Sequence, residues 1–138
     1  MFPSLKICAI AIVTGVLAVG VQSPAFAKKG GVCATLNAIN PDNDGTIDMN
    51  EAKQAASATF DRLDKDKDGT LSIAELQGRL SRKDFAAGDP DKDKTVTKDE
   101  YLAIVAEHFK AADANGEGTV DCTEAKSPAG QALFRLLK

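Results

Sequence analysis

The 138-residue sequence has no tryptophan, one tyrosine (Tyr101) and one histidine (His108). A lone histidine beside Glu107, without a serine or cysteine in a nucleophile context, offers little for acid–base or covalent catalysis, so we expect no enzyme activity. Strand-like alternation of apolar and polar residues appears nowhere at length, and proline is scarce between the acidic segments. These absences argue against an extended β-sheet and favour an all-α class with alanine-rich helix packing.

The segment 1–27 has the organisation of a secretory signal peptide. One positive charge, Lys6, precedes an uncharged and mostly apolar run at 7–21. The segment ends in Ala25-Phe26-Ala27, with small residues at the two positions that signal peptidase reads, so we expect cleavage after this motif. The apolar run is short for a membrane span, and an uncleaved anchor is the alternative. The mature chain, 28–138, would then be periplasmic or secreted, with no membrane contact.

Acidic residues are concentrated in a few places. Of the 20 aspartates and glutamates, 17 fall in four short windows of equal length, which hold only five lysines and no arginine. Carboxylates at this density repel one another unless a cation neutralises them. The rest of the mature chain is net positive, but its basic residues are spread thinly over helices and termini, so we expect no nucleic-acid partner.

The four windows repeat at a nearly fixed spacing. They begin at positions 40, 64, 89 and 113, so each start follows the previous one by 24 or 25 positions. We number them windows one to four: 40–51, 64–75, 89–100 and 113–124. A repeat of this kind indicates one structural unit used four times.

Each window matches the 12-residue Ca²⁺ loop of an EF-hand. Oxygen-bearing side chains stand at positions 1, 3 and 5, threonine offers its backbone carbonyl at position 7, and glutamate always stands at position 12, where both its oxygens can bind. Because four windows agree in register, we predict sites for up to four metal ions, Ca²⁺ or lanthanide(III). The predicted metal ligands are Asn40, Asp42, Asp44, Thr46, Asp48 and Glu51 in window one; Asp64, Asp66, Asp68, Thr70, Ser72 and Glu75 in window two; Asp89, Asp91, Asp93, Thr95, Thr97 and Glu100 in window three; and Asp113, Asn115, Glu117, Thr119, Asp121 and Glu124 in window four.

The connectors between windows are short: 52–63, 76–88 and 101–112. At the rise of an α-helix, each is long enough for one helix of about 18–20 Å. One helix therefore leaves one window and enters the next, and two windows at opposite ends of a straight helix cannot pair.

The middle connector differs from the other two. Ser81 and Asp84 resemble a capping box and Gly78 lies nearby, so we expect a bend there. The bend lets windows two and three pair and leaves one and four to pair, through an apolar residue at position 8 of each window. The predicted fold is a compact EF-hand bundle of residues 28–138, with short shared helices and windows paired 1/4 and 2/3.

Two cysteines, Cys33 and Cys122, follow the leader and lie at opposite ends of the mature sequence. An oxidising compartment allows them to pair. A bridge would close a loop of about 90 residues, worth up to ~4 kcal/mol, and would staple the 1/4 end. Two free or separately buried thiols are the alternative.

Beyond the windows, the sequence resembles the lanmodulin family, exported bacterial proteins that bind lanthanide ions. The resemblance covers residues 37–138 and rests on the short spacing and on the following features: Pro41 and Pro90 at position 2, and the segments 78–81, 100–103, 109–112 and 127–130. It implies a helical bundle with fused helices and 1/4 and 2/3 pairing. It also implies a preference for trivalent lanthanides over Ca²⁺, ordering on binding, and the periplasm of methanol-oxidising bacteria.

The sequence departs from that family at several positions. Lys65 and Ala114 replace proline at position 2, Asn40 begins window one, and Lys94 takes position 6 of window three, where glycine is expected. Because Coulomb attraction grows with ion charge, each carboxylate favours a trivalent ion. Four candidate carboxylates per window are fewer than the family pattern, so we expect weaker lanthanide selectivity. Window three should be weakest, since a left-handed lysine costs on the order of 1 kcal/mol.

The leading hypothesis is a metal-ion-binding protein that orders when it binds Ca²⁺ or a lanthanide. The alternative is a calcium-dependent protein-interaction module, either dockerin-like or a sensor. Dockerins repeat Ca²⁺ loops at a similar spacing but typically have two of them, without glutamate at every position 12. Sensors use methionine-rich surfaces, and Met49 is the only methionine after the leader. The sequence identifies no protein partner.

Overall fold

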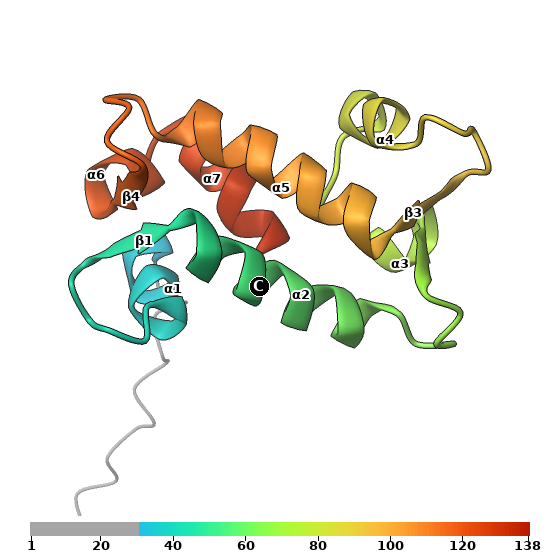
Figure 1. Ribbon diagram of the computed structural model, residues 1–138, viewed down its shortest axis with the longest axis horizontal. Coiled ribbons are helices and arrows are strands. Elements are labelled where there is room, and N and C mark those ends of the chain that lie inside the picture. The colour runs from blue at the N-terminus through green and yellow to red at the C-terminus, as the bar shows by residue number, and fades with distance from the viewer. Residues whose placement is uncertain (1–30) are drawn as a thin grey trace, which may run out of the picture.

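The computed structural model describes residues 31–138 as seven helices and four three-residue strands (Figure 1). The predicted signal peptide, 1–27, lies outside the described residues. The chain is mostly helical, as predicted, with two small sheets that the all-α description leaves out. In chain order the elements are α1 (Val32–Ile39), β1 (Thr46–Asp48), α2 (Met49–Leu63), β2 (Thr70–Ser72), α3 (Ile73–Leu76), α4 (Arg82–Gly88), β3 (Thr95–Thr97), α5 (Lys98–Ala112), β4 (Thr119–Asp121), α6 (Cys122–Ala125) and α7 (Pro128–Leu136).

Two helices of 15 residues, α2 and α5, run side by side through the molecule (Figure 1). Each begins at a capping box, which satisfies backbone N–H groups that the first turn leaves unpaired. Each ends where an aspartate N–H donates to the carbonyl of Phe60 or Phe109, at 2.9 Å in both cases. Each helix leaves one window and enters the next, so the short connectors do form shared helices.

The middle connector is broken into two short helices. Helix α3 stops at Leu76 because Gln77 and Gly78 take left-handed backbone angles, with φ of 51° and 75°. Ser81 then caps α4: its Oγ accepts from the N–H of Asp84 at 3.1 Å and donates to the Asp84 carboxylate at 2.6 Å. The bend predicted near Gly78 is therefore present, and it turns the chain back between β2 and β3.

The strands form two antiparallel pairs, β1 with β4 and β2 with β3. Ile47 lies opposite Val120 in the first pair, and Leu71 lies opposite Val96 in the second. All four side chains are fully buried. Apolar residues at the centre of such short strands anchor each pair in the core, because a two-stranded ribbon alone is marginal in water.

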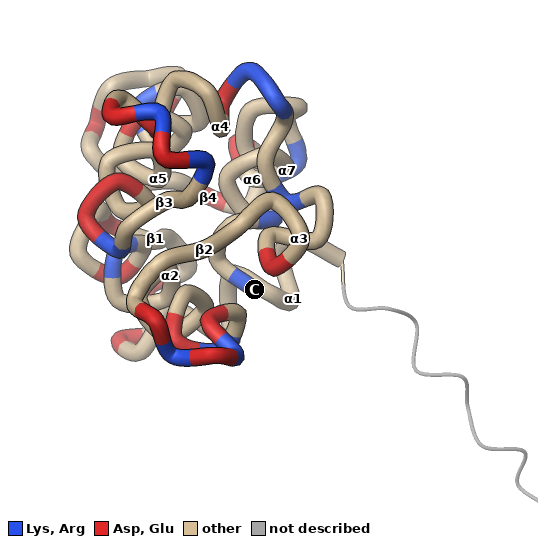
Figure 2. Tube along the Cα trace, turned by 90° about the vertical axis from the view of Figure 1, so that its right-hand side faces the viewer, with Lys and Arg blue, Asp and Glu red and all other residues tan. Residues whose placement is uncertain are grey.

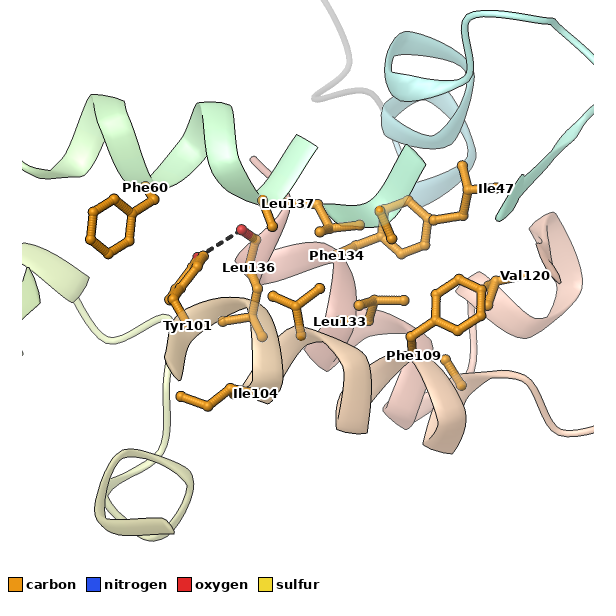
Figure 3. Close-up of a cluster of buried hydrophobic side chains, with 14 of the residues drawn as sticks. Ile47, Phe60, Tyr101, Ile104, Phe109, Val120, Leu133, Phe134, Leu136 and Leu137 are labelled. Carbon is orange, nitrogen blue, oxygen red and sulfur yellow. Dashed lines mark hydrogen bonds between the residues drawn. The ribbon is translucent and has the colours of Figure 1, made fainter. Parts of the chain in front are cut away.

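The hydrophobic core lies between α2, α5 and α7 (Figure 3). Tyr101 is its largest fully buried side chain, and its hydroxyl donates to the carbonyl of Leu136 at 2.7 Å. Its ring meets Phe60 edge-on, with centroids 5.8 Å apart. Ser127 caps α7, with Pro128 at the first helical position, a combination typical of helix starts.

At the other end of the core, α1 packs on α6. Leu36 of α1 is buried, and a disulfide joins Cys33 to Cys122, with the two Cα atoms 5.2 Å apart. The bridge ties the helix that enters window one to the last turn of window four. Across residues 31–138, every helix is too short to cross a bilayer.

Candidate metal-binding loops

The four windows occupy equivalent places in the fold. Each begins at the C-terminal end of a helix, runs through a loop, forms a strand at positions 7–9, and ends in the first turn of the next helix. Acidic residues gather along these loops (Figure 2). The strand pairs therefore hold two windows back to back, with positions 2–6 of each exposed to solvent and position 1 buried or half-buried.

Positions 9 and 12 cap the helix that follows each window. In window one the carboxylate of Asp48 accepts from the N–H of Glu51, and Glu51 accepts from the N–H of Asp48, both at 2.8 Å. The same reciprocal pair forms in every window. The predicted ligands at positions 9 and 12 are thus held in place by backbone bonds, with one glutamate oxygen at the helix N-terminus.

The second oxygen of a position-12 glutamate can reach back across its window. In window four Oε1 of Glu124 accepts from the N–H of Ala114 at 3.0 Å and from that of Asn115 at 3.4 Å. A glutamate that binds a metal through both oxygens has to span the loop in this direction. The backbone geometry therefore already brings position 12 towards the start of the loop.

Carboxylates converge most closely in windows two and three. One oxygen each from Asp64, Asp66 and Asp68 lie within 4.8 Å of one another, and the counterparts Asp89, Asp91 and Asp93 do the same. These are the residues predicted at positions 1, 3 and 5. Three carboxylate oxygens at this separation can bind one hard cation such as Ca²⁺.

Asp64 gives an independent sign that window two suits a cation. Its Oδ2 accepts from the N–H of Gly69 at 3.1 Å. Its Oδ1 is buried and has no hydrogen-bond donor, alone among the side-chain oxygens and nitrogens that the structure describes. A buried carboxylate oxygen without a partner is costly, and a cation held with Asp66, Asp68 and Glu75 would supply the missing contact.

Desolvation and crowding among the carboxyl groups of the clusters raise two pKa values. The N–H of Asp68 donates to Asp66 and lowers its pKa, but desolvation, the charges of Asp68 and Glu75 and the neighbouring Asp64 carboxyl outweigh that bond, so the pKa of Asp66 is raised. Metal and protons therefore compete for such sites.

Window three shows the same repulsion. The Asp89 carboxyl is the main reason that the pKa of Asp91 is raised; a bond from the N–H of Asp93 opposes it, and desolvation and the charges of Asp93 and Glu100 add to it. A cation among these oxygens would relieve the repulsion.

The threonine at position 7 holds the carboxylate at position 5. In window three the N–H and hydroxyl of Thr95 donate to Asp93 at 2.8 and 2.7 Å, and these bonds lower the pKa of Asp93. Thr46 acts in the same way on Asp44, whose pKa is also lowered. These bonds therefore favour the ionised form of the position-5 carboxylate in windows one and three.

Windows one and four hold their residues differently. Asn40 is 3% exposed; its amide oxygen accepts from the N–H of Asn43 at 2.8 Å, and its amide nitrogen donates to Asp44 at 3.3 Å. In window four Asp113 accepts from three backbone amides between 2.8 and 3.2 Å. Among the described residues, neither window brings three carboxylates as close as windows two and three do, because each has asparagine at position 1 or 3.

Sequence reasoning missed the left-handed backbone at position 4 of each window, which only window four fills with glycine, Gly116. Asn43, Lys67 and Lys92 have φ of 58°, 60° and 60°, in the left-handed region. Asparagine tolerates that region, but lysine gives no signal of it. At position 6, Lys94 has φ of 72°, which agrees with the expectation that window three carries backbone strain there.

One known family matches part of the chain. The EF-hand family model matches residues 57–81, which include the end of α2, window two and α3. A comparison with curated proteins returns no match. The EF-hand match agrees with the helix–loop–helix geometry and suggests binding of metal ions, calcium among them.

Proposed function

We propose that this protein is an exported EF-hand protein that binds Ca²⁺ or trivalent lanthanides in up to four loops and orders when it does so. The observation that carries the proposal is the buried, unpartnered Oδ1 of Asp64, at the centre of a carboxylate cluster inside the segment that matches the EF-hand family. A cation there would satisfy the orphan oxygen and offset the repulsion that raises the pKa of Asp66.

All four windows belong to the proposal because they share one local architecture. Each has a strand at positions 7–9 and a capping glutamate at position 12. Each also has four candidate carboxylates, more negative charge than Ca²⁺ alone requires. That excess favours a trivalent ion of similar radius, and the resemblance to the lanmodulin family points the same way. We propose no catalytic role for any residue.

A titration of the purified chain, stripped of metal with a chelator, tests the function. La³⁺ and Ca²⁺ are added separately, with helix content followed by circular dichroism and stoichiometry by calorimetry. A response at far lower La³⁺ than Ca²⁺ supports the lanthanide assignment, and equal responses leave a calcium binder. Uptake of neither ion at millimolar concentration would overturn the proposal.

Two charge-neutralising variants in one window separate ligands from bystanders. Asp93→Asn removes a candidate ligand at position 5 and should weaken one site at least about tenfold. Asp99→Asn makes the same change at exposed position 11 of that window, outside the ligand set, and should leave affinity nearly unchanged. Equal effects would show that only net charge matters.

Export is tested by the mature N-terminus. If the leader is cleaved as proposed, the protein recovered from the periplasm or medium begins at Lys28, and its mass by mass spectrometry lacks residues 1–27. A chain that keeps those residues and stays with the membrane fraction would support the uncleaved anchor.

A further inference from the structure

A groove lies between α4 and α5, beside the windows. Its volume is about 260 Å³, and most of its lining is apolar, with Ala87, Ala103 and Ile104 among the lining residues. Asp84, Glu100 and Glu107 also line it, whereas none of its lining residues is lysine or arginine. It is therefore an apolar slot with a negative edge.

The first half of the molecule contains an equivalent groove in which Glu51 is the only acidic lining residue. Window three begins at 89 and window one at 40, and windows four and two, at 113 and 64, are related by the same offset of 49 positions. Applying this offset, Ala38, Pro41 and Glu51 of the groove between α1 and α2 correspond to Ala87, Pro90 and Glu100. The two grooves have similar volumes, about 290 and 260 Å³.

The added polar groups of the second groove have uncharged counterparts in the first. Asp84, Glu107 and His108 correspond to Thr35, Ala58 and Thr59, and those three residues do not line the first groove. The imidazole Nε2 of His108 lies 3.8 Å from Asp84, across the α4–α5 contact. None of these three added groups is a predicted metal ligand, so metal binding alone does not account for them.

We propose that the groove between α4 and α5 is a docking site for a short basic and apolar segment of a partner protein. An apolar side chain of the partner enters the slot, and a neighbouring lysine or arginine meets the carboxylates of Asp84 and Glu107. Glu107 also pairs with Lys110 at 2.8 Å on the same helix, but both side chains are exposed, so that pair is worth little in water and gives way to the partner's cation. Pockets that enclose small molecules usually exceed roughly 300 Å³, and this slot is smaller, which favours insertion of one or two side chains. Charge complementarity selects a basic partner segment.

The docking site does not depend on the proposed metal function. Asp84 and Glu107 lie outside all four windows, and only Glu100 is shared with window three. The groove is present in the fold as described, between two helices that pack on each other. Failure of metal binding would therefore leave the docking proposal standing, and the reverse also holds.

The test is an NMR titration of the ¹⁵N-labelled chain, with its disulfide intact. The probe is a capped hexapeptide of alternating leucine and lysine, and the control peptide alternates leucine and glutamate. Both are added with and without saturating Ca²⁺, whose binding is measured separately by calorimetry. We expect saturable shifts concentrated in α4 and α5 with the lysine peptide and none with the glutamate peptide.

Matched variants decide whether the groove itself is occupied. Ala103→Leu fills the slot from an exposed position of α5 and should weaken the lysine peptide about tenfold. Gln54→Leu makes the corresponding change in the first groove and should have no effect. Glu107→Gln should weaken binding about threefold, in a salt-dependent way. If Ala103→Leu unfolds the chain by circular dichroism, Ala87→Leu fills the slot from α4 instead.

Several outcomes would overturn the proposal. Shifts spread over the four windows, or of equal size in α1 and α2, would indicate diffuse attraction to acidic loops. Unchanged binding of the lysine peptide to a folded Ala103→Leu or Ala87→Leu variant would also overturn it, as would equal binding of the glutamate peptide. Calcium uptake without peptide binding rejects the docking site alone, while peptide binding without uptake of either Ca²⁺ or La³⁺ rejects the metal function alone.

Discussion

The first half of the described chain (α1 to α3) and the second half (α4 to α7) share one plan. The two ends at which their windows pair, 1/4 and 2/3, are held together differently. At the 1/4 end, Cys33 and Cys122 are bridged. The offset that relates the two halves places Arg82 and Ile73 at the corresponding positions of the 2/3 end. There, Ile73 is 59% exposed, the only exposed large hydrophobic side chain among the described residues. One end is stapled covalently, whereas the other relies on a strand pair and on the bend at Gly78.

The second half also ends in a helix, α7, that has no counterpart of its own in the first half. Helix α7 follows α6 and packs along α5, while the chain after α3 turns directly into α4. The side chains that fill the core differ in the same way. Tyr101 of α5 reaches the last turn of α7, whereas the corresponding residue of α2 is the much smaller Ala52. A duplicated scaffold thus supports one reinforced half and one lighter half.

The largest expected effect comes from removing the disulfide at the 1/4 end. Replacing Cys33 and Cys122 by serine opens a bridge with a sequence separation of 89, and we expect the free energy of unfolding to fall by about 4 kcal/mol. Urea unfolding at fixed Ca²⁺ measures this change. A reductant should reproduce the loss in the native chain and do nothing to the serine variant. If the serine variant is as stable as the native chain, the disulfide does not make the 1/4 end more stable than the 2/3 end.

A second prediction exchanges the packing of the halves. A Cβ at Gly88 would clash with Cδ1 of Ile104; the corresponding first-half pair is Ile39 and Ala55. Gly88→Ile alone should cost about 2 kcal/mol through overpacking. Adding Ile104→Ala rebuilds the first-half pair and should recover at least half of that loss.

A double-mutant cycle by thermal or urea unfolding measures this coupling. The single variant Ile104→Ala is the necessary control, since it alone should destabilise by leaving a void. Additive effects of the two substitutions would show that Gly88 and Ile104 are not a reciprocal pair, and the comparison between the two grooves would lose its packing basis.

Local patterns account for most of what the sequence predicted correctly. The short connectors required shared helices, and the Ser81 cap with Gly78 required a bend. These are near-neighbour effects, fixed by backbone hydrogen bonds and φ preferences.

The features that sequence reasoning missed depend on tertiary contacts. Phe134 of α7 and Ile104 of α5 are buried, but which face of each helix is covered is set only once α7 and α4 pack on α5. The role of Tyr101 depends on the carbonyl of Leu136, far along the chain. In the windows, the candidate ligands followed from the repeat, but the close approach of Asp64, Asp66 and Asp68 and the orphan oxygen depend on how each loop folds.

Tyr101 provides a pH-dependent test of the reinforced half. Desolvation by burial raises its pKa to about 12, despite the opposing charges of Arg79 and Arg62. The unfolded chain loses the phenol proton near pH 10, so stability is full below pH 10 and falls as pH rises towards 12, by about 2 kcal/mol. Because Tyr101 is the only tyrosine and tryptophan is absent, tyrosinate absorbance reports this one group.

The absorbance midpoint should lie near 12 in the folded chain and near 10 in urea. Tyr101→Phe removes the signal and flattens this part of the stability curve. It should also cost about 1–2 kcal/mol at neutral pH, since it leaves the Leu136 carbonyl without its donor. A folded midpoint near 10 would show that the hydroxyl is open to water.

The smallest expected effect concerns position 6, where the halves differ by one residue. Gly45 of window one has φ of 89°, and its counterpart Lys94 holds φ of 72° with a side chain. Lys94→Gly should relieve about 1 kcal/mol of backbone strain and strengthen window three about fivefold. Lys94→Ala removes the same charge but keeps the side-chain carbon, so it separates strain from electrostatics. Calorimetry with Ca²⁺ or La³⁺ should give the highest affinity with glycine at position 94, a lower one with alanine and the lowest with lysine. Equal affinities for the glycine and alanine variants would assign the whole effect to charge. The backbone difference between the halves would then have no consequence for binding.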